Sequence, residues 1–221
     1  MAKPKKPPKK PQRPAAPAQA TKVAAPSSAI TREFKLEIKL LDLWHAGSGR
    51  GSGQHLDALV VRDEQRLPYL PGKHLRGLLR EALHCVESWG QASTFGLATR
   101  LLGPRGEAPA PGSTPGLIDI TNATMLPVEH AWFNQNPAAA RELFTSVTRT
   151  AMDHERGVAL PKSLRAIELV VPMTLKADLT FRGCTDALRL DLSNAIGLVR
   201  AVGGGRNRGL GRARLLLEEV R

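Results

Sequence analysis

The longest alternation of apolar and other side chains in this chain spans residues 167–181, and this pattern limits the fold more than any other feature. Successive side chains of a strand point to opposite faces of a sheet. The pattern therefore predicts one long, half-buried strand. Residues 34–40 alternate in the same way, from Phe34 to Leu40, and predict a second strand. The apolar positions of the longer run are Ile167, Leu169, Val171, Met173, Leu175, Ala177, Leu179 and Phe181.

Helical spacing of apolar residues appears in two segments, 73–86 and 187–202. Short strands are predicted at 117–121 and 213–217, and a short irregular strand at 55–63. The resulting order is strand, helix, strand, insertion, strand, helix, strand. This order is typical of an α+β, ferredoxin-like βαββαβ domain, the plan that also underlies RNA-recognition sheets. The insertion covers about 127–165, with a short helix predicted at 137–147 and a polar loop at 148–160.

The chain is strongly basic, with 221 residues, a formal net charge of +12 and a pI of about 10.4. Residues 1–26 carry seven Lys and Arg residues and no acid, which leaves a net charge of +5 on the rest. A basic domain favours phosphate-bearing partners. We expect residues 1–30, rich in Lys, Pro and Ala, to be a disordered tail, and residues 31–221 to form one domain. Two cysteines and no apolar run of membrane length predict a cytoplasmic protein without membrane partners.

A glycine–arginine loop precedes the last predicted strand. Five glycines and four arginines share residues 201–214. Free N–H groups of such a loop can cradle phosphate oxygens, and arginines can clamp them with forked hydrogen bonds. The alternative is a flexible hairpin with solvated charges. The residues predicted to bind RNA here are Gly203, Gly204, Gly205, Arg206, Arg208, Gly209, Gly211 and Arg212.

The start of the first helix is a second predicted anion site. Lys73 and His74 follow a Pro-Gly turn, where free N–H groups and the helix dipole favour an anion. Arg76 and Arg80 lie four residues apart, on the face opposite the apolar one. They would extend a basic track for RNA phosphates, or else form an ordinary solvated helix face.

Four segments, in order, resemble the RAMP superfamily of CRISPR-associated proteins, in particular the repeated backbone subunit of type III effector complexes. Residues 55–63, His-Leu-Asp-Ala-Leu-Val-Val-Arg-Asp, are similar to the family's Gly-Ile-Asp-Asn-Pro-Val-Ile-Arg-Asp loop. Residues 67–80 are similar to Pro-Tyr-Ile-Pro-Gly-Ser-Ser-Leu-Lys-Gly-x-x-Arg. Residues 152–159 are similar to Ile-Asp-Arg-x-Thr-Gly-x-Ala. Residues 203–211 are similar to Gly-Gly-x-x-x-Arg-Gly-x-Gly.

This resemblance implies a guide-RNA-binding subunit that assembles with copies of itself and other CRISPR effector subunits and presents the guide to single-stranded target RNA. It implies that Asp57 cuts the target RNA with a divalent metal ion, Mg²⁺, and that the insertion acts as a thumb that interrupts the guide–target duplex. A carboxylate can hold magnesium together with waters and phosphate oxygens. The alternative is that Asp57 only caps a loop. The implied thumb residues are Met152, Asp153, His154, Arg156 and Val158.

Two other functions stay open at this level. The chain could be a RAMP endoribonuclease that matures precursor guide RNA without metal, with His45 or His55 as general base. Both histidines could instead be bystanders that form structural hydrogen bonds. The other alternative is a basic RNA-scaffold protein with no catalytic activity.

Overall fold

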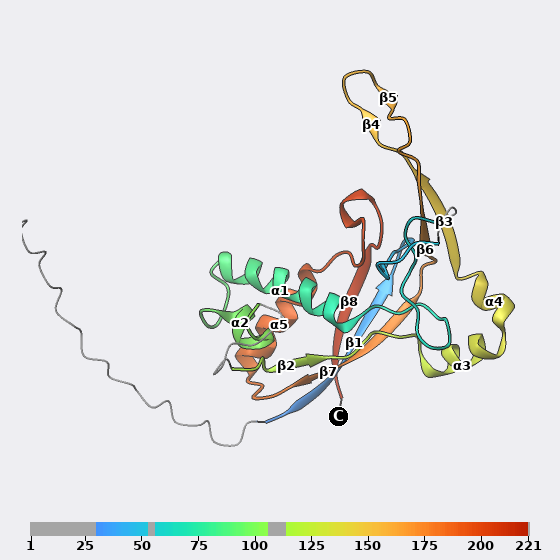
Figure 1. Ribbon diagram of the computed structural model, residues 1–221. Coiled ribbons are helices and arrows are strands. Elements are labelled where there is room, and N and C mark those ends of the chain that lie inside the picture. The colour runs from blue at the N-terminus through green and yellow to red at the C-terminus, as the bar shows by residue number, and fades with distance from the viewer. Residues whose placement is uncertain (1–29, 53–55, 106–113, 221) are drawn as a thin grey trace, which may run out of the picture.

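The computed structural model describes residues 30–52, 56–105 and 114–220. Its main sheet has the order β2–β7–β1–β8, and all neighbouring strands are antiparallel (Figure 1). The four strands are β1 (Arg32–Leu40), β2 (Ile118–Ile120), β7 (Thr174–Phe181) and β8 (Ala213–Glu219). β7 lies between β1 and β2, as in a split βαβ unit. The predicted α+β, ferredoxin-like fold is therefore confirmed.

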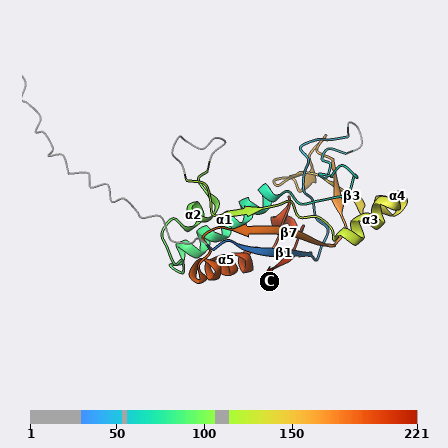
Figure 2. The same ribbon diagram turned by 90° about the horizontal axis from the view of Figure 1, so that it is seen from below.

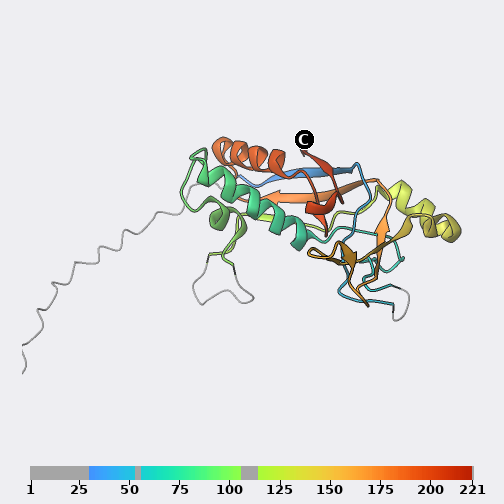
Figure 3. The same cartoon turned by 90° about the horizontal axis from the view of Figure 1, so that it is seen from above.

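The helices cover one face of this sheet (Figures 2 and 3). They are α1 (Gly72–Ser88), α2 (Leu97–Leu102) and α5 (Asp186–Leu198). The apolar side of each strand faces them: Leu36 and Ile38 of β1 and Leu179 of β7 are fully buried. α5 ends at Leu198, four residues before the predicted end, and Thr185 caps its start by accepting a hydrogen bond from the Leu188 amide.

The other face of the sheet carries charged side chains that pair across strands. Lys35 forms an ion pair with Asp178, and Lys176 Nζ lies 3.0 Å from Glu37 Oε2. Both pairs join residues directly opposite each other in β1 and β7. Opposite charges at such positions stabilise the pairing of strands. They also neutralise each other, so this face has little net charge to offer an RNA.

The single strand predicted over 167–181 is wrong. The chain forms two strands, β6 (Arg165–Val170) and β7, with Pro172 between them. Proline has no N–H to donate to a ladder, so strand pairing is interrupted there. β6 leaves the main sheet and pairs with β3 (Phe144–Arg149) to form a second, two-stranded antiparallel unit, the β3–β6 ribbon.

Buried Trp44 ties the β3–β6 ribbon to the end of the main sheet. Its backbone exchanges two hydrogen bonds with Val170, of 2.8 and 3.0 Å, and its indole N–H donates to the Val171 carbonyl at 3.1 Å. Residues 56–62 run along the other edge of β6 and contact it through an isolated bridge between Ala58 and Ile167. The predicted irregular strand over 55–63 is thus a series of isolated bridges in its described part.

The insertion contains more regular structure than its sequence indicates. It comprises α3 (Pro127–Gln135), α4 (Pro137–Arg141), β3, and a small hairpin of β4 (Met152–Asp153) and β5 (Val158–Ala159). The helix predicted at 137–147 ends at Arg141, and its second half is a strand instead. Figure 1 shows the β4–β5 hairpin projecting from the end of the β3–β6 ribbon, far from the helical layer.

Two predictions fall on other parts of the chain: the disordered tail and His55 lie outside the described residues. In the described part, no helix is both long enough and apolar enough to cross a membrane.

Candidate nucleic-acid interface

Three backbone amides of the glycine–arginine loop are hydrogen-bonded to neighbouring segments of the protein. The amide of Gly203 donates to His74 Nε2 at 2.8 Å, that of Gly204 to the His45 carbonyl at 2.6 Å, and that of Gly211 to the Leu43 carbonyl at 2.8 Å. These three donors are therefore not free for phosphate, and this part of the sequence-based prediction is wrong. A loop that crosses other backbone segments must satisfy its buried N–H groups within the protein.

Glycine is required where the loop touches the rest of the protein. Gly203 has φ +81°, and a Cβ there would lie 2.4 Å from the His45 carbonyl oxygen. Gly211 has φ +68°, and its Cβ would lie 2.0 Å from the Val202 carbonyl oxygen. The glycines thus allow a close backbone crossing. Between them, the arginines lie on a short 3₁₀ turn, η1 (Arg206–Arg208).

His74 supports the loop as a hydrogen-bond acceptor. Burial lowers the pKa of its imidazole, and the charge of Arg206 lowers this pKa further, while Glu81 raises it. The low pKa favours the neutral ring, whose unprotonated Nε2 accepts the Gly203 N–H. His74, predicted to bind RNA, is here a positioning residue for the glycine–arginine loop.

The start of α1 is not an open anion site. Gly72 is buried, and its amide donates to Asn122 Oδ1 at 2.9 Å. A Cβ on Gly72 would lie 2.6 Å from the Ile120 carbonyl oxygen, so the chain after β2 covers this helix end. The Gly72 amide is therefore not available to an anion, while contact of Lys73 with RNA stays a prediction. Lys73 itself is exposed and remains accessible to solvent.

Arg80 belongs to the interior rather than to an exposed basic track. Its side chain is buried, and Nη2 donates to the Leu102 and Gly103 carbonyls at 3.1 and 2.9 Å. These carbonyls end α2, where helices leave acceptors without intrahelical partners. Burial, followed by the charges of Arg76 and Arg105, lowers the pKa of Arg80. Arg76 lies at the surface, and its guanidinium also donates to the Leu102 carbonyl.

The arginines of the loop have different surroundings. Arg206 Nη1 lies 3.2 Å from Glu81 Oε2, and Arg212 Nε lies 3.0 Å from Asp42 Oδ2. Arg208 forms no ion pair with any acidic residue in the described part of the chain. It faces a groove of about 830 Å³ between the loop, the β3–β6 ribbon and the β4–β5 hairpin, which we call the arginine groove.

The arginine groove brings together three arginines that are far apart in the sequence. Arg149 ends β3, Arg165 begins β6 directly opposite it, and Arg208 comes from η1. Gly205 brings the loop close to the ribbon, since its Cβ would lie 3.5 Å from Arg149 Nη1. Among the described residues, no Asp or Glu lines the groove. The full lining is Arg149, Thr150, Ala151, Met152, His154, Ser163, Arg165, Ile167 and Arg208.

Sequence reasoning missed Arg149 and Arg165. Each looks like an isolated charge in a polar stretch, and only the pairing of β3 with β6 places them opposite each other. The alternation of Ile167 and Leu169 does predict a strand here, but it does not identify the partner strand. The information that identifies both arginines is the pairing of two strand ends, which a local sequence pattern does not contain.

Asp57 lies at the edge of this site. It is exposed, its Oδ2 accepts a hydrogen bond from the Ala166 amide at 2.7 Å, and its own amide donates to the Ala166 carbonyl at 2.8 Å. Ala166 is the residue between Arg165 and Ile167, which both line the arginine groove. One carboxylate oxygen thus caps the edge of β6, and the other has no hydrogen-bond partner among the described residues.

Asp57 is the carboxylate that the resemblance assigns to the implied magnesium site. Nowhere in the described chain do three or more His, Cys, Asp or Glu side chains gather to hold a metal ion. Mg²⁺ is commonly bound through one or two carboxylates, with water and substrate phosphates completing its shell. The open oxygen of Asp57 fits such a site if RNA phosphates supply the remaining ligands. His45 has a structural role: its Nδ1–H donates to the Glu168 carbonyl at 2.7 Å.

The predicted thumb residues all lie in or near the β4–β5 hairpin. Met152 and Val158 are half exposed, at 51% and 55%, on neighbouring strands. Asp153 holds the turn, because its Oδ1 accepts from the amides of Glu155 and Arg156 at 3.0 and 3.2 Å. His154 is exposed and lines the arginine groove. The projecting hairpin therefore carries two apolar side chains and a histidine next to the three arginines.

Residues 37–214 match the family model of the RAMP superfamily. The chain belongs to the RAMP superfamily. No curated protein matches its sequence. Its fold is similar to that of a chain in a cryo-EM structure of type III-B Cmr-beta in the apo state, with a TM-score of 0.63 and 12% identity over 84% of this chain and 97% of that one.

A second similar chain comes from the type III-B Cmr-beta bound to cognate target RNA. Its TM-score is 0.61 and its identity 13%, over 87% of this chain and 98% of that one. In this RAMP protein the β4–β5 hairpin and the β3–β6 ribbon extend the ferredoxin-like core on one side (Figure 1). The arginine groove lies between them and the glycine–arginine loop.

Proposed function

We propose that this RAMP protein is a guide-RNA-binding backbone subunit of a type III CRISPR ribonucleoprotein, which presents the guide to target RNA and cleaves the target through Asp57 with a divalent metal ion. The observation that carries the proposal is the arginine groove, where Arg149, Arg165 and Arg208 converge without an acidic residue in the described lining. Its position beside Asp57 gives one surface both an RNA site and a candidate catalytic carboxylate.

The arginines fit a backbone-tracking mode of RNA binding. Guanidinium groups bind phosphate oxygens through paired hydrogen bonds, and they do so without regard to base sequence. A subunit that is repeated along a guide RNA must accept any sequence. The low aromatic content of 4% agrees with this mode, because binding through rows of stacked bases needs several aromatic platforms.

The hairpin adds a means of interrupting a duplex. Met152 and Val158 offer apolar surface at the end of a rigid ribbon, where they could insert between base pairs. Apolar wedges that enter base steps unstack them and kink the nucleic acid. A nucleotide released from the stack exposes its 2′-OH for in-line attack on the next phosphate. The interrupted strand would lie above the groove, near the carboxylate of Asp57.

The role of Asp57 follows from its two oxygens. The oxygen bonded to the Ala166 amide holds the carboxylate in place. The other oxygen would be available to hold a divalent ion. When bound, such an ion neutralises charge that develops on the phosphate oxygens. Arg165, next to Ala166 in β6, would hold the adjacent phosphate.

The test uses a reconstituted complex with guide and target RNA, and compares Asp57→Asn with Asp57→Ala. Asparagine retains an oxygen for the Ala166 N–H and removes only the negative charge, whereas alanine removes both. We expect both variants to load guide RNA and bind target, and neither to cut it. A chelator should stop cutting by the wild type.

Wild-type cutting rates in Asp57→Asn would show that Asp57 only caps the β6 edge. A second candidate function is then favoured by His154, which is exposed in the arginine groove. A metal-independent endoribonuclease that matures precursor guide RNA would use such a histidine as general base. It would cut repeat RNA in the presence of chelator, and His154→Ala would abolish that cutting.

A further inference from the structure

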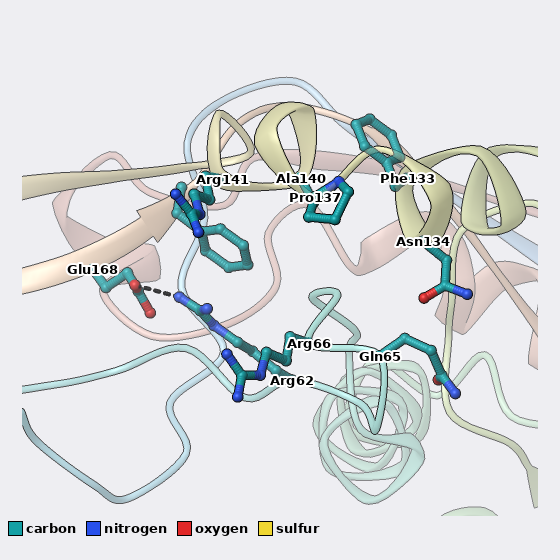
Figure 4. A pocket seen from close by; sticks show the side chains of 10 residues that line it. Arg62, Gln65, Arg66, Phe133, Asn134, Pro137, Ala140, Arg141 and Glu168 are labelled. Carbon is teal, nitrogen blue, oxygen red and sulfur yellow. Dashed lines mark hydrogen bonds and ion pairs between the residues drawn. The ribbon is translucent and has the colours of Figure 1, made fainter.

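A second cavity, of about 480 Å³, lies between α3, α4 and the turn at residues 63–67, and the proposed function makes no use of it. It is on the other side of the β3–β6 ribbon from the arginine groove: Ile167 lines the groove and Glu168 lines this cavity, and successive strand residues point to opposite faces. We call it the α3–α4 pocket (Figure 4).

The guanidinium group of one arginine in the α3–α4 pocket is held in place by an ion pair and by an aromatic ring. Arg62 Nη2 lies 2.6 Å from Glu168 Oε1, and its guanidinium carbon lies 3.7 Å from the centre of the Phe144 ring. Glu168 is buried, and its second oxygen accepts the Val60 amide at 2.9 Å. Both carboxylate oxygens are thus used. The charge of Glu168 is balanced by Arg62, and no acidic group in the lining is left for a further cation.

A second arginine enters the pocket from a strained backbone position. Arg66 has φ +65°, in the left-handed region that residues other than glycine seldom adopt. The turn around it is well determined: Asp63 Oδ1 accepts the Leu67 amide at 2.8 Å, and Asp63 Oδ2 lies 2.8 Å from His130 Nε2 on α3. Glycine would relieve the strain at this position, so Arg66→Gly removes the side chain without a backbone cost.

Arg66 and Arg141 supply charge without compensation. Neither forms an ion pair with an acidic residue in the described part of the chain. The lining contains three arginines and one glutamate, a net charge of +2. A concave site with two unneutralised guanidinium groups favours a ligand with an anionic group, and phosphate suits their forked geometry.

The remaining lining suits a flat ring system. Figure 4 shows Pro137, Ala140 and Phe133 on the side opposite Arg62 and Arg66, with Asn134 and Gln65 at one end. The first three form an apolar wall, and Phe144, on which the Arg62 guanidinium stacks, adds a further apolar surface to the lining. The amide side chains at the end each offer a donor and an acceptor, the groups that read the edges of bases.

We propose that the α3–α4 pocket binds a single nucleotide, with the phosphate on Arg66 and the base against the apolar wall. The ligand is either a free nucleoside monophosphate or one unpaired nucleotide of an RNA strand, since both carry the same phosphate and base. The inference goes beyond the proposed function, because the pocket and the arginine groove lie on opposite faces of the ribbon.

The experiment measures calorimetric binding of AMP, GMP, CMP and UMP to the full chain, and crosslinking of single-stranded RNA that contains 4-thiouridine. The key variant is Arg66→Gly, which removes the side chain and relieves the backbone. We expect its melting temperature to equal or exceed that of the wild type, with nucleotide binding or crosslinking at this pocket about tenfold weaker. Lys162→Gly is the matched control, since Lys162 also has φ of +59° and lies outside the pocket lining. It should bind as the wild type does.

The two arms separate the sources of the nucleotide. Binding of a monophosphate identifies a free nucleotide as a ligand, while crosslinking to residues of the pocket without monophosphate binding identifies an RNA unit; either result supports the proposal. Wild-type binding and crosslinking by Arg66→Gly would overturn it. The proposal would also be overturned if the wild type showed neither monophosphate binding nor crosslinking at the pocket. Tighter binding of a glutamate-rich peptide than of any nucleotide would overturn it as well. Arg149→Ala with Arg165→Ala should weaken guide binding and leave this pocket unaffected, which keeps failure of the two proposals distinguishable.

Discussion

Removal of the three groove arginines tests whether RNA phosphates bind in the arginine groove. In the variant Arg149→Ala, Arg165→Ala, Arg208→Ala, the side chains are cut back at positions that form no described ion pair. Arg165 and Arg208 are exposed and Arg149 is half-buried. Little stability should therefore be lost, and the fold should stay intact. The affinity for guide RNA should fall for all sequences alike, because phosphate contacts carry no base information.

The magnitude follows from the number of charges. Each phosphate neutralised on a single strand contributes about 0.7 to the slope of log affinity against log salt, so three contacts contribute about 2. Between about 50 and about 200 mM salt, the wild type should therefore lose about twentyfold more affinity than the triple variant. At the lower salt concentration the difference between the two proteins should be largest.

Fluorescence anisotropy with a labelled guide RNA at a series of salt concentrations measures both slopes. The control is Arg100→Ala, Arg182→Ala, Arg189→Ala, which removes the same formal charge at the α2–α5 end of the molecule, where the residues are exposed. Two of these arginines form ion pairs, Arg182 with Asp119 and Arg189 with Asp186. The control should lower affinity through net charge but retain most of the slope. Equal slopes in the triple variant and the wild type would refute the assignment of the arginine groove as the RNA site.

Three further predictions concern the supports of this surface. Gly211→Ala should lower the free energy of unfolding in urea by about 3 kcal/mol or more, because the new Cβ would lie 2.0 Å from the Val202 carbonyl oxygen. Gly209→Ala, also at positive φ but in open space, should lower it by only about 1 kcal/mol. Because the pKa of His74 is lowered in the folded state, its contribution to stability is fully present above about pH 6.5 and is lost as the pH falls from there to the folded-state pKa. Melting curves should show this loss in the wild type and a smaller one in His74→Gln. Arg80→Met should cost about 1–3 kcal/mol, because the Gly103 carbonyl loses the Arg80 donor and the Leu102 carbonyl retains only that of Arg76. It should leave the affinity for guide RNA unchanged.

The main sheet was predictable because local periodicity determines it. β1, α1 and β8 appear in the sequence as short repeats of period 2 or 3.6, and their order is enough to give the split βαβ plan. The division between β6 and β7 was not detected, since Val171 and Met173 continue the alternation across Pro172. Only the proline marks the break, and the change of sheet depends on pairing with a strand about twenty residues earlier.

The candidate site was less predictable than the fold. From residue type, we expected the arginines of residues 201–214 and of α1 to form one RNA-binding track. In the structure, several of them are instead occupied by contacts within the protein. Arg80 is long enough to reach the carbonyls at the end of α2, and Arg206 and Arg212 reach acidic neighbours. A charge pattern alone does not show which guanidinium groups remain available. In the arginine groove those are Arg208 from the predicted set and two arginines that strand pairing supplies.

Alternate residues of β6 line two different sites on the two faces of the strand. Arg165 and Ile167 face the arginine groove, while Glu168 faces the α3–α4 pocket. Insertion of one residue between this strand and its anchor at Trp44 would exchange the two faces, because a slip by one position reverses every side chain of a strand. A carboxylate would then stand where phosphate should bind. Length changes in β6 are therefore compatible with RNA binding only in steps of two residues, whereas the β4–β5 hairpin beyond Arg149 and Arg165 is free to lengthen or shorten. Divergence among proteins built on this ribbon should accordingly concentrate in the hairpin, and its reach should vary while the polarity of the groove stays fixed.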